Sequence, residues 1–195
     1  MKREELNSIL DFIRRSERLK NTLRSGYTST GRNESVAEHT WRLCLMALVL
    51  EKYFPEADIA RVLKICIVHD LGEALNGDIP APLQSEELSK AANERNDFLK
   101  LMEDLPAEIQ KELIGLWDEY EHASSPEAKA AKALDKLETI IQHNQGKNPD
   151  DFDYSFNLDY GKMFTSEHPV ASEIRKILDA ETIKRAEEAR NNLYE

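Results

Sequence analysis

Two histidines and two aspartates stand out among the 195 residues as a possible set of metal ligands. His39 follows a Ser-Val-Ala-Glu segment, and His69 with Asp70 comes directly after the apolar run Ile65–Val68. Asp135 lies in a stretch with helical periodicity, although aspartate is unfavourable inside helices. Imidazole nitrogens and carboxylate oxygens together suit Mn²⁺, Co²⁺, Fe²⁺, Ni²⁺ or Zn²⁺ better than Ca²⁺. The sequence therefore predicts one divalent metal ion, held by these four side chains.

Three members of this set, His69, Asp70 and Asp135, also have simpler structural explanations. The pair His69-Asp70 would fit a hydrogen-bonded helix end, and Asp135 would fit a surface carboxylate paired with Lys132 or Lys136. The order of the residues favours a metal site: a histidine, an adjacent His-Asp pair and an aspartate, each on a separate predicted helix. A metal ion would also provide the partner that a carboxylate at the end of a buried apolar helix needs.

Helical periodicity dominates the chain, and no segment alternates apolar and polar residues for long enough to predict a strand. We therefore expect an all-α fold, a single compact helical domain over residues 1–195, with its metal-site core at about 35–140. The expected elements are a helix around Leu6–Ile13, a polar loop over 20–34, and helices from the Ser35/Glu38 capping box, from Asp58 to His69, over about 86–103, from Pro106 to Tyr120, from Pro126 to Gln145 and over about 169–193.

Composition limits the possible partners and compartments. Charged residues make up 32% of the chain and the net charge is −11, which argues against binding to a nucleic-acid polymer because that needs a basic face. No apolar run approaches the roughly 18 residues of a membrane helix, and the N-terminus does not resemble a secretory signal. Cys44 and Cys66 are expected to be buried thiols. We therefore expect a cytoplasmic protein that does not contact membranes.

The ordered histidines and aspartates resemble the H…HD…D signature of the HD superfamily of metal-dependent phosphohydrolases. Within it, the segments Ser35–His39, His69–Ala74 and Gly77–Pro80 resemble the 5′-deoxynucleotidase branch. They are closer to its archaeal and eukaryotic group than to its bacterial YfbR group. The resemblance implies an HD-type helical fold, a homodimer, and metal-dependent hydrolysis of (deoxy)nucleoside 5′-monophosphates to nucleoside and phosphate.

The resemblance also implies catalytic roles for two further carboxylates. Glu73 lies one helical turn after His69, and is expected to act as a general base or to orient the attacking water. The alternative for Glu73 is a solvated glutamate at a helix end. Asp78 is expected to contact the sugar hydroxyl of the nucleotide, or otherwise to cap the Asp-Ile-Pro turn.

Contacts to the phosphate are expected from the polar segment that precedes His39. Arg24 and Arg32 are the candidates, since a guanidinium can bind phosphate through two hydrogen bonds; either could instead be a solvated loop charge. The YfbR enzymes have an adjacent Arg-Trp pair that binds phosphate and blocks a 2′-hydroxyl. Here Tyr27 follows Gly26, and we expect Tyr27 to stand in the place of that tryptophan.

Two other functions are alternatives at this point. An HD-type phosphodiesterase or pyrophosphohydrolase would act on other nucleotides, but its dinuclear members carry two more histidines between the HD pair and the last aspartate. Only His122 lies in that interval, so a second metal ion is not expected. A non-catalytic helical regulatory domain is disfavoured because Glu73 accompanies a full ligand set.

Overall fold

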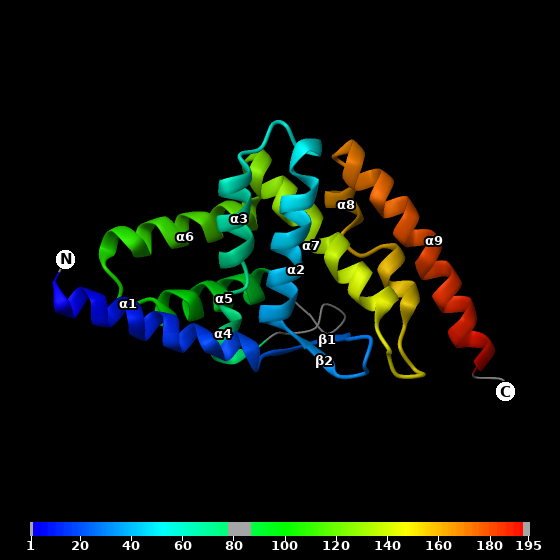
Figure 1. Cartoon of the computed structure of the whole chain (residues 1–195), viewed down its shortest axis with the longest axis horizontal. Helices are drawn as coiled ribbons and strands as arrows, with labels where there is room; N and C mark the ends of the chain where they lie inside the picture. Colours follow the sequence, from blue (N-terminus) through cyan, green and yellow to red (C-terminus); the bar gives the residue numbers. More distant parts are fainter. Residues whose placement is uncertain (1, 78–86, 193–195) are drawn as a thin grey trace.

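Helix α7 lies at the centre of the fold, which the computed structural model describes over residues 2–77 and 87–192 (Figure 1). It begins as predicted, because Ser125 caps the helix through its side chain and Pro126 occupies the first position. α7 spans Pro126–Gln145, and most of its side chains are buried. Four of the longer helices pack against it, namely α2 (Val36–Leu50), α3 (Ile59–Val68), α6 (Ala107–His122) and α9 (Pro169–Asn192), and so does the short helix α8 (Lys162–Thr165).

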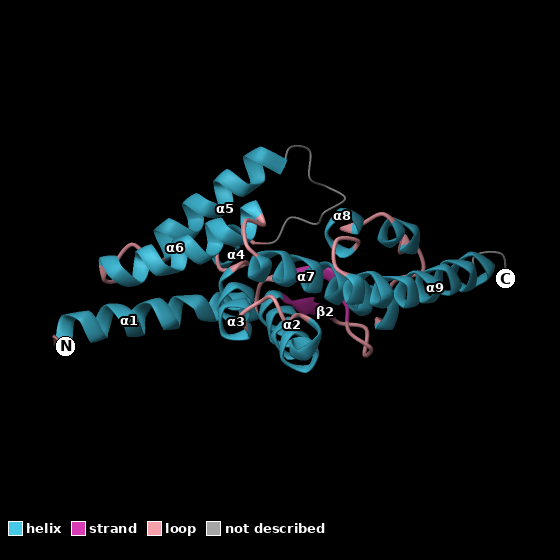
Figure 2. Cartoon of the chain, turned by 90° about the horizontal axis from the view of Figure 1, so that it is seen from above, coloured by secondary structure: helices cyan, strands magenta, loops and turns pink. Residues whose placement is uncertain are grey.

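The hydrophobic core lies between α2, α3 and α7. Leu43, Ile65 and Leu134, one from each of these helices, are almost completely buried. A smaller cluster, which includes Leu137 and Ala171, joins α7 to α9. Figure 2 shows α7 in the middle, with α2 and α3 along one side and α6 on the other. The expected all-α fold is confirmed.

Local sequence sets the ends of the two helices that precede the His-Asp pair. Ser35 and Glu38 form the predicted capping box at the start of α2, each side chain accepting a hydrogen bond from the backbone N–H of the other. Asp58 caps the first turn of α3. α3 ends at Val68, so His69 is its C-cap residue and points from the end of a buried helix.

The remaining described elements are shorter or peripheral. They are α1 (Arg3–Ser16), the 3-10 helices η1 (Glu17–Lys20), η2 (Glu51–Tyr53) and η4 (Tyr154–Leu158), α4 (Glu73–Asn76) and α5 (Glu87–Leu101). The long helices start and stop within a few residues of the predicted positions. Over the described ranges, no helix is both long enough and apolar enough to cross a membrane.

The expectation of a polar loop over residues 20–34 was wrong. This segment forms a two-stranded antiparallel ribbon, with β1 at Leu23–Tyr27 and β2 at Asn33–Ser35. The strands are too short to show alternation in the sequence, and Gly31 adopts a positive φ of 87° in the turn between them. Contacts with α7 hold the ribbon, for example the hydrogen bond from the Gln142 side chain to the Tyr27 carbonyl.

Candidate metal centre

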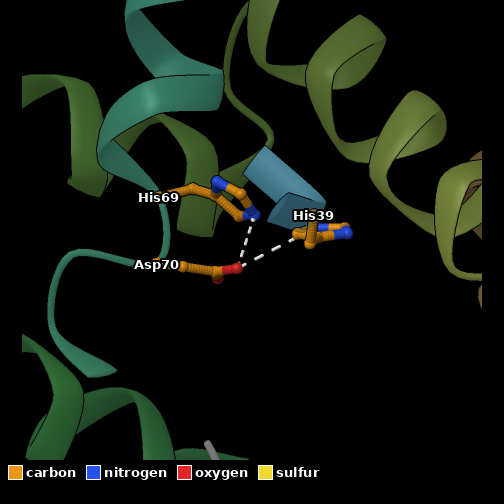
Figure 3. Close-up of side chains that lie close together, drawn as sticks. All are labelled: His39, His69 and Asp70. Atoms are coloured by element: carbon orange, nitrogen blue, oxygen red, sulfur yellow. Dashed lines mark ion pairs between the residues drawn. The ribbon is translucent and has the colours of Figure 1, made fainter. Parts of the chain in front are cut away.

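His39, His69, Asp70 and Asp135 come together where α2, the end of α3 and α7 meet. His69 Nε2 lies 3.1 Å from Asp70 Oδ2, and His39 Nε2 lies 3.1 Å from Asp135 Oδ1. The remaining cross-distances are 3.9 Å from His39 Nε2 to Asp70 Oδ2 and 4.0 Å from His69 Nε2 to Asp135 Oδ1. Figure 3 shows His39, His69 and Asp70 side by side, with dashed lines that join both imidazole rings to the Asp70 carboxylate. The fold therefore brings all four predicted ligands to one point.

The atoms that face this point fit a metal ion. His39 Nε2, His69 Nε2 and Asp70 Oδ2 are buried and make no hydrogen bond of normal geometry. Buried polar atoms are rarely left in this condition, because they lose their contacts with water. Two imidazole nitrogens with two carboxylate oxygens form a donor set suited to a borderline divalent cation.

The opposite nitrogen of each imidazole ring has a partner. His69 Nδ1 lies 2.8 Å from the carbonyl oxygen of Cys66, and His39 Nδ1 is hydrogen-bonded to the Glu138 carboxylate. A proton on Nδ1 would donate to these acceptors and leave the lone pair of Nε2 directed at the cluster. This is the usual arrangement of histidines that bind metals.

Asp135 is buried, unlike the surface carboxylate that was the alternative for this residue. Its Oδ2 accepts a hydrogen bond of 2.6 Å from the Tyr120 hydroxyl and lies 2.9 Å from Lys136 Nζ. These contacts leave Oδ1 directed at His39. Burial raises the pKa of Asp135, but Lys136 and His39 outweigh it and bring the pKa well below its usual value. The carboxylate is therefore charged at neutral pH.

Neighbouring charges shift the pKa values of Asp70 and His39 in opposite directions. Burial raises the pKa of Asp70, yet the neighbouring histidines and Arg24 reverse this effect and lower the pKa below its usual value. Burial and Arg24 disfavour a charged His39, but Glu138 and Asp135 prevail and raise its pKa to about 9. These neighbouring charges favour a protonated His39 and an ionised Asp70.

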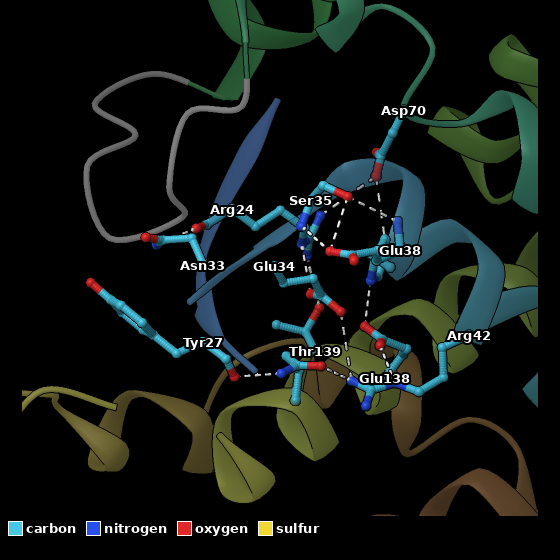
Figure 4. A network of polar contacts seen from close by, with 12 residues as sticks. Arg24, Tyr27, Asn33, Glu34, Ser35, Glu38, Arg42, Asp70, Glu138 and Thr139 are labelled. Atoms are coloured by element: carbon cyan, nitrogen blue, oxygen red, sulfur yellow. Dashed lines mark hydrogen bonds and ion pairs between the residues drawn. The ribbon is translucent and has the colours of Figure 1, made fainter. Parts of the chain in front are cut away.

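Arg24 lies beside the cluster, on β1. Its Nη1 is 3.5 Å from Asp70 Oδ2, its Nη2 donates a hydrogen bond of 3.1 Å to Thr139 Oγ1, and its Nε is 3.7 Å from Glu34 (Figure 4). Its side chain is only 14% exposed. A guanidinium in this position can reach an anion bound next to the ligand set.

Arg32 and Tyr27 lie farther out. Arg32 is exposed and donates a hydrogen bond of 2.9 Å to Glu38, which lowers the pKa of that carboxyl to about 2. Tyr27 ends β1, is half-buried, and in Figure 4 directs its ring away from Asp70. The structure therefore places Arg24 beside the ligand cluster and Arg32 away from it, although the sequence made both equal candidates for phosphate binding.

Glu73 is the first residue of α4, and its side chain is buried. Its backbone N–H donates a hydrogen bond of 3.0 Å to the carbonyl of Asp70, so a tight turn links it to the His-Asp pair. The solvated glutamate at a helix end, which was the alternative for this residue, does not match this burial. Asp78, the other expected catalytic carboxylate, lies outside the described residues.

Glu138 was not singled out from the sequence, although it is completely buried and contacts His39. It lies one helical turn after Asp135, and this spacing places both carboxylates on the same side of α7. The burial of that side becomes visible only when α2 packs against α7. Periodicity alone could not distinguish Glu138 from a surface glutamate.

Known proteins resemble this chain in sequence and in fold. The HD domain family model matches residues 16–175. The 5′-deoxynucleotidase HDDC2 of Homo sapiens is 36% identical over 71% of this chain and 68% of its own length, and that of Dictyostelium discoideum is 32% identical over 70% and 76%. These relatives agree with the expected likeness to the eukaryotic group.

A solved structure supports the same assignment. The crystal structure described as a predicted metal-dependent phosphohydrolase from Magnetospirillum magnetotacticum has a TM-score of 0.78 and 26% sequence identity, and covers 93% of this chain and 94% of its own. The family match spans the elements that carry the histidine and aspartate cluster. The chain therefore belongs to the HD domain family of metal-dependent phosphohydrolases.

Proposed function

We propose that this protein is a metal-dependent phosphomonoesterase that hydrolyses (deoxy)nucleoside 5′-monophosphates to nucleoside and phosphate. The observation that carries the proposal is the convergence of two imidazole Nε2 atoms and two carboxylate oxygens, with nearest pairs 3.1 Å apart and three of the atoms lacking hydrogen bonds. The 5′-deoxynucleotidase names of the relatives support this substrate class and disfavour a non-catalytic role.

One divalent ion, drawn from Mn²⁺, Co²⁺, Fe²⁺, Ni²⁺ and Zn²⁺, is the proposed cofactor. His39, His69, Asp70 and Asp135 would hold it. When bound, such an ion lowers the pKa of water and offsets negative charge on phosphoryl oxygens. Tyr120 and Lys136 keep Oδ1 of Asp135 directed at the site by occupying its Oδ2.

Arg24 is the proposed principal contact to the phosphate. Its guanidinium lies 3.5 Å from Asp70, whose charge a bound cation would share. Thr139 and Glu34 hold the arginine in place, so it can bind a phosphoryl group beside the ligand set without a large rearrangement. Arg32 is a weaker candidate, because it is exposed and already paired with Glu38.

Glu73 is the proposed general base. A carboxylate that is buried next to the His-Asp pair can accept a proton from the attacking water as the bond to phosphorus forms. Asp78, which follows α4 by two residues in the sequence, is proposed to bind the sugar hydroxyl, as the resemblance to the 5′-deoxynucleotidases implies. Tyr27 is proposed to lie along the nucleoside and to influence the choice between deoxyribose and ribose.

Phosphate release from a panel of nucleotides tests the proposed function. The panel contains 5′- and 3′-monophosphates, ribo and deoxy, with Mn²⁺, Co²⁺ or EDTA. The proposal expects metal-dependent release from 5′-monophosphates and none with EDTA. If metal-loaded protein released phosphate from no monophosphate, but cleaved phosphodiesters or pyrophosphates, the phosphomonoesterase assignment would be wrong.

We also propose that the protein is a cytoplasmic homodimer. Cys44 and Cys66 are free thiols, and burial raises the pKa of both, so they suit a reducing compartment. Large apolar side chains on α2 face outward, away from α7: Trp41, Leu45, Leu48 and Val49, with exposed fractions from 42% to 67%. A second copy of the chain could cover this face.

A further inference from the structure

A network of charged side chains that includes Glu34, Arg42 and Glu138 contacts the Nδ1 side of His39, opposite the Nε2 atom that faces Asp135 (Figure 4 shows Glu34, Arg42 and Glu138). Glu138 is its central member and has no exposed surface. One oxygen, Oε2, is hydrogen-bonded to His39 Nδ1, and the other, Oε1, accepts a hydrogen bond of 2.6 Å from Arg42 Nε. Both oxygens of this carboxylate are therefore engaged.

Arg42 is itself fixed by several partners. Its Nη1 donates a hydrogen bond of 3.1 Å to Gln145, its Nη2 donates to Gln142, and Nη2 also lies 3.8 Å from Glu34. These partners come from α7 and β2, whereas Arg42 belongs to α2. The arginine thus links three elements and holds Glu138 at a fixed distance from His39.

A second metal ion is the other explanation for this group, because ligand atoms of Glu34, His39 and Glu138 lie within 4.8 Å of one another. Two arginines already balance these carboxylates: Arg42 contacts both, and Arg24 Nε lies 3.7 Å from Glu34. His39 Nδ1 is already hydrogen-bonded to Glu138. The carboxylates of Glu34 and Glu138 are therefore already paired with arginines. This pairing favours a role in holding the His39 ring over a second metal site.

We propose that Glu138 is a positioning residue that holds the proton of His39 on Nδ1 and directs Nε2 at the metal ion, with Arg42 fixing the carboxylate. The inference rests on the metal centre proposed above. A carboxylate that accepts the Nδ1 proton orients the ring and makes Nε2 a better donor to the metal. Loss of such a partner commonly weakens metal binding by about 10–100-fold.

The first test is the dissociation constant of Mn²⁺, measured by calorimetry on the full chain. Glu138→Gln removes the charge with little change in size, and should weaken Mn²⁺ binding by about 10–100-fold. Glu112→Gln is the matched control, because Glu112 pairs with Lys64 on the surface of α6 and its loss should leave the constant unchanged. Equal affinity in wild type and Glu138→Gln would overturn the proposal.

The second test uses the wild-type protein, so it does not depend on how the variant folds. Long-range ¹H–¹⁵N spectra of the Zn²⁺-loaded protein report which nitrogen of each histidine carries the proton. The proposal expects the His39 proton on Nδ1 and protected from exchange with solvent. A His39 proton on Nε2, or an Nδ1 proton that exchanges freely, would contradict it.

These tests distinguish the existence of the metal centre from the role of Glu138. If wild-type protein binds no Mn²⁺, the metal centre itself is wrong. If wild type binds Mn²⁺ and Glu138→Gln binds it equally well, the metal centre stands and only the role of Glu138 is lost.

Discussion

Chemistry at the residue scale depends on which carboxylate oxygens and imidazole nitrogens are already engaged. Asp135 has one oxygen held by Tyr120 and Lys136, and His39 has one nitrogen held by Glu138. In both residues the remaining atom faces the cluster. Burial makes these contacts decisive, because an unpartnered charge inside a protein is very unfavourable.

Substitution of Glu73 should lower turnover without loss of metal binding. The variant Glu73→Ala keeps the four proposed ligands, so its Mn²⁺ content should match that of wild type. Turnover should fall by about 10²–10⁴-fold, the usual contribution of a general base. Steady-state kinetics at saturating Mn²⁺, together with metal analysis of the purified variant, measure both quantities. A variant with wild-type turnover would remove Glu73 from the mechanism.

The two arginines of the β-ribbon segment offer a matched comparison. Arg24→Ala removes a mostly buried cation beside Asp70 and should lower kcat/KM by about 10–100-fold, the value of one or two hydrogen bonds to a charged group. Arg32→Ala removes an exposed cation paired with Glu38 and should change kcat/KM by less than about threefold. The opposite ranking would place the phosphate at Arg32.

At the scale of elements, the sequence predicted the features that residues close together in the chain determine, such as the starts of helices. The Ser35/Glu38 capping box and the Ser125 cap with Pro126 marked the starts of α2 and α7 correctly. Contacts between distant segments were not predictable in this way. The β-ribbon depends on α7, and the role of Glu138 becomes visible only when α2 lies against α7.

The turn between the His-Asp pair and α4 depends on a close approach to α5. A Cβ atom at Gly72 would lie 2.5 Å from the carbonyl oxygen of Glu94, so Gly72→Ala must displace α5 or the turn. We expect it to lower the free energy of unfolding by about 1–3 kcal/mol, as in other overpacked sites. Urea denaturation followed by circular dichroism measures this loss.

Gly115→Ala provides the control for that substitution. Gly115 lies inside α6, and a Cβ there would meet no atom of the described residues within 4 Å, apart from its chain neighbours and the backbone of its own helix. Alanine is favoured over glycine inside a helix by about 1 kcal/mol, so this variant should be slightly more stable than wild type. If Gly72→Ala were as stable as Gly115→Ala, the tight packing of the turn against α5 would be incorrect.

At the scale of the whole molecule, the outward face of α2 is the feature that the isolated chain does not explain. Trp41 is 67% exposed, although α2 also provides Leu43 and Ala47 to the core. The helix is therefore apolar on two sides. A helix of this kind normally packs against other elements or another protein on both apolar sides.

Trp41→Lys should convert a dimer into a monomer, because it places a charge in the proposed interface. Light scattering coupled to size-exclusion chromatography gives the mass directly. Ile177→Lys on α9 is the control, since Ile177 is 62% exposed on a different element and its substitution should not change the mass. A wild-type protein that is monomeric would exclude the dimer, and dissociation by Ile177→Lys alone would move the interface to α9.

The central claim is that one divalent ion binds between His39, His69, Asp70 and Asp135. Anomalous diffraction from crystals soaked in Mn²⁺ locates the ion directly. The account predicts a single peak at about 2.0–2.2 Å from the two Nε2 atoms and from one oxygen of each aspartate, and no peak in the Asp70→Ala variant. A peak at another position, or no peak in crystals of active protein, would contradict it.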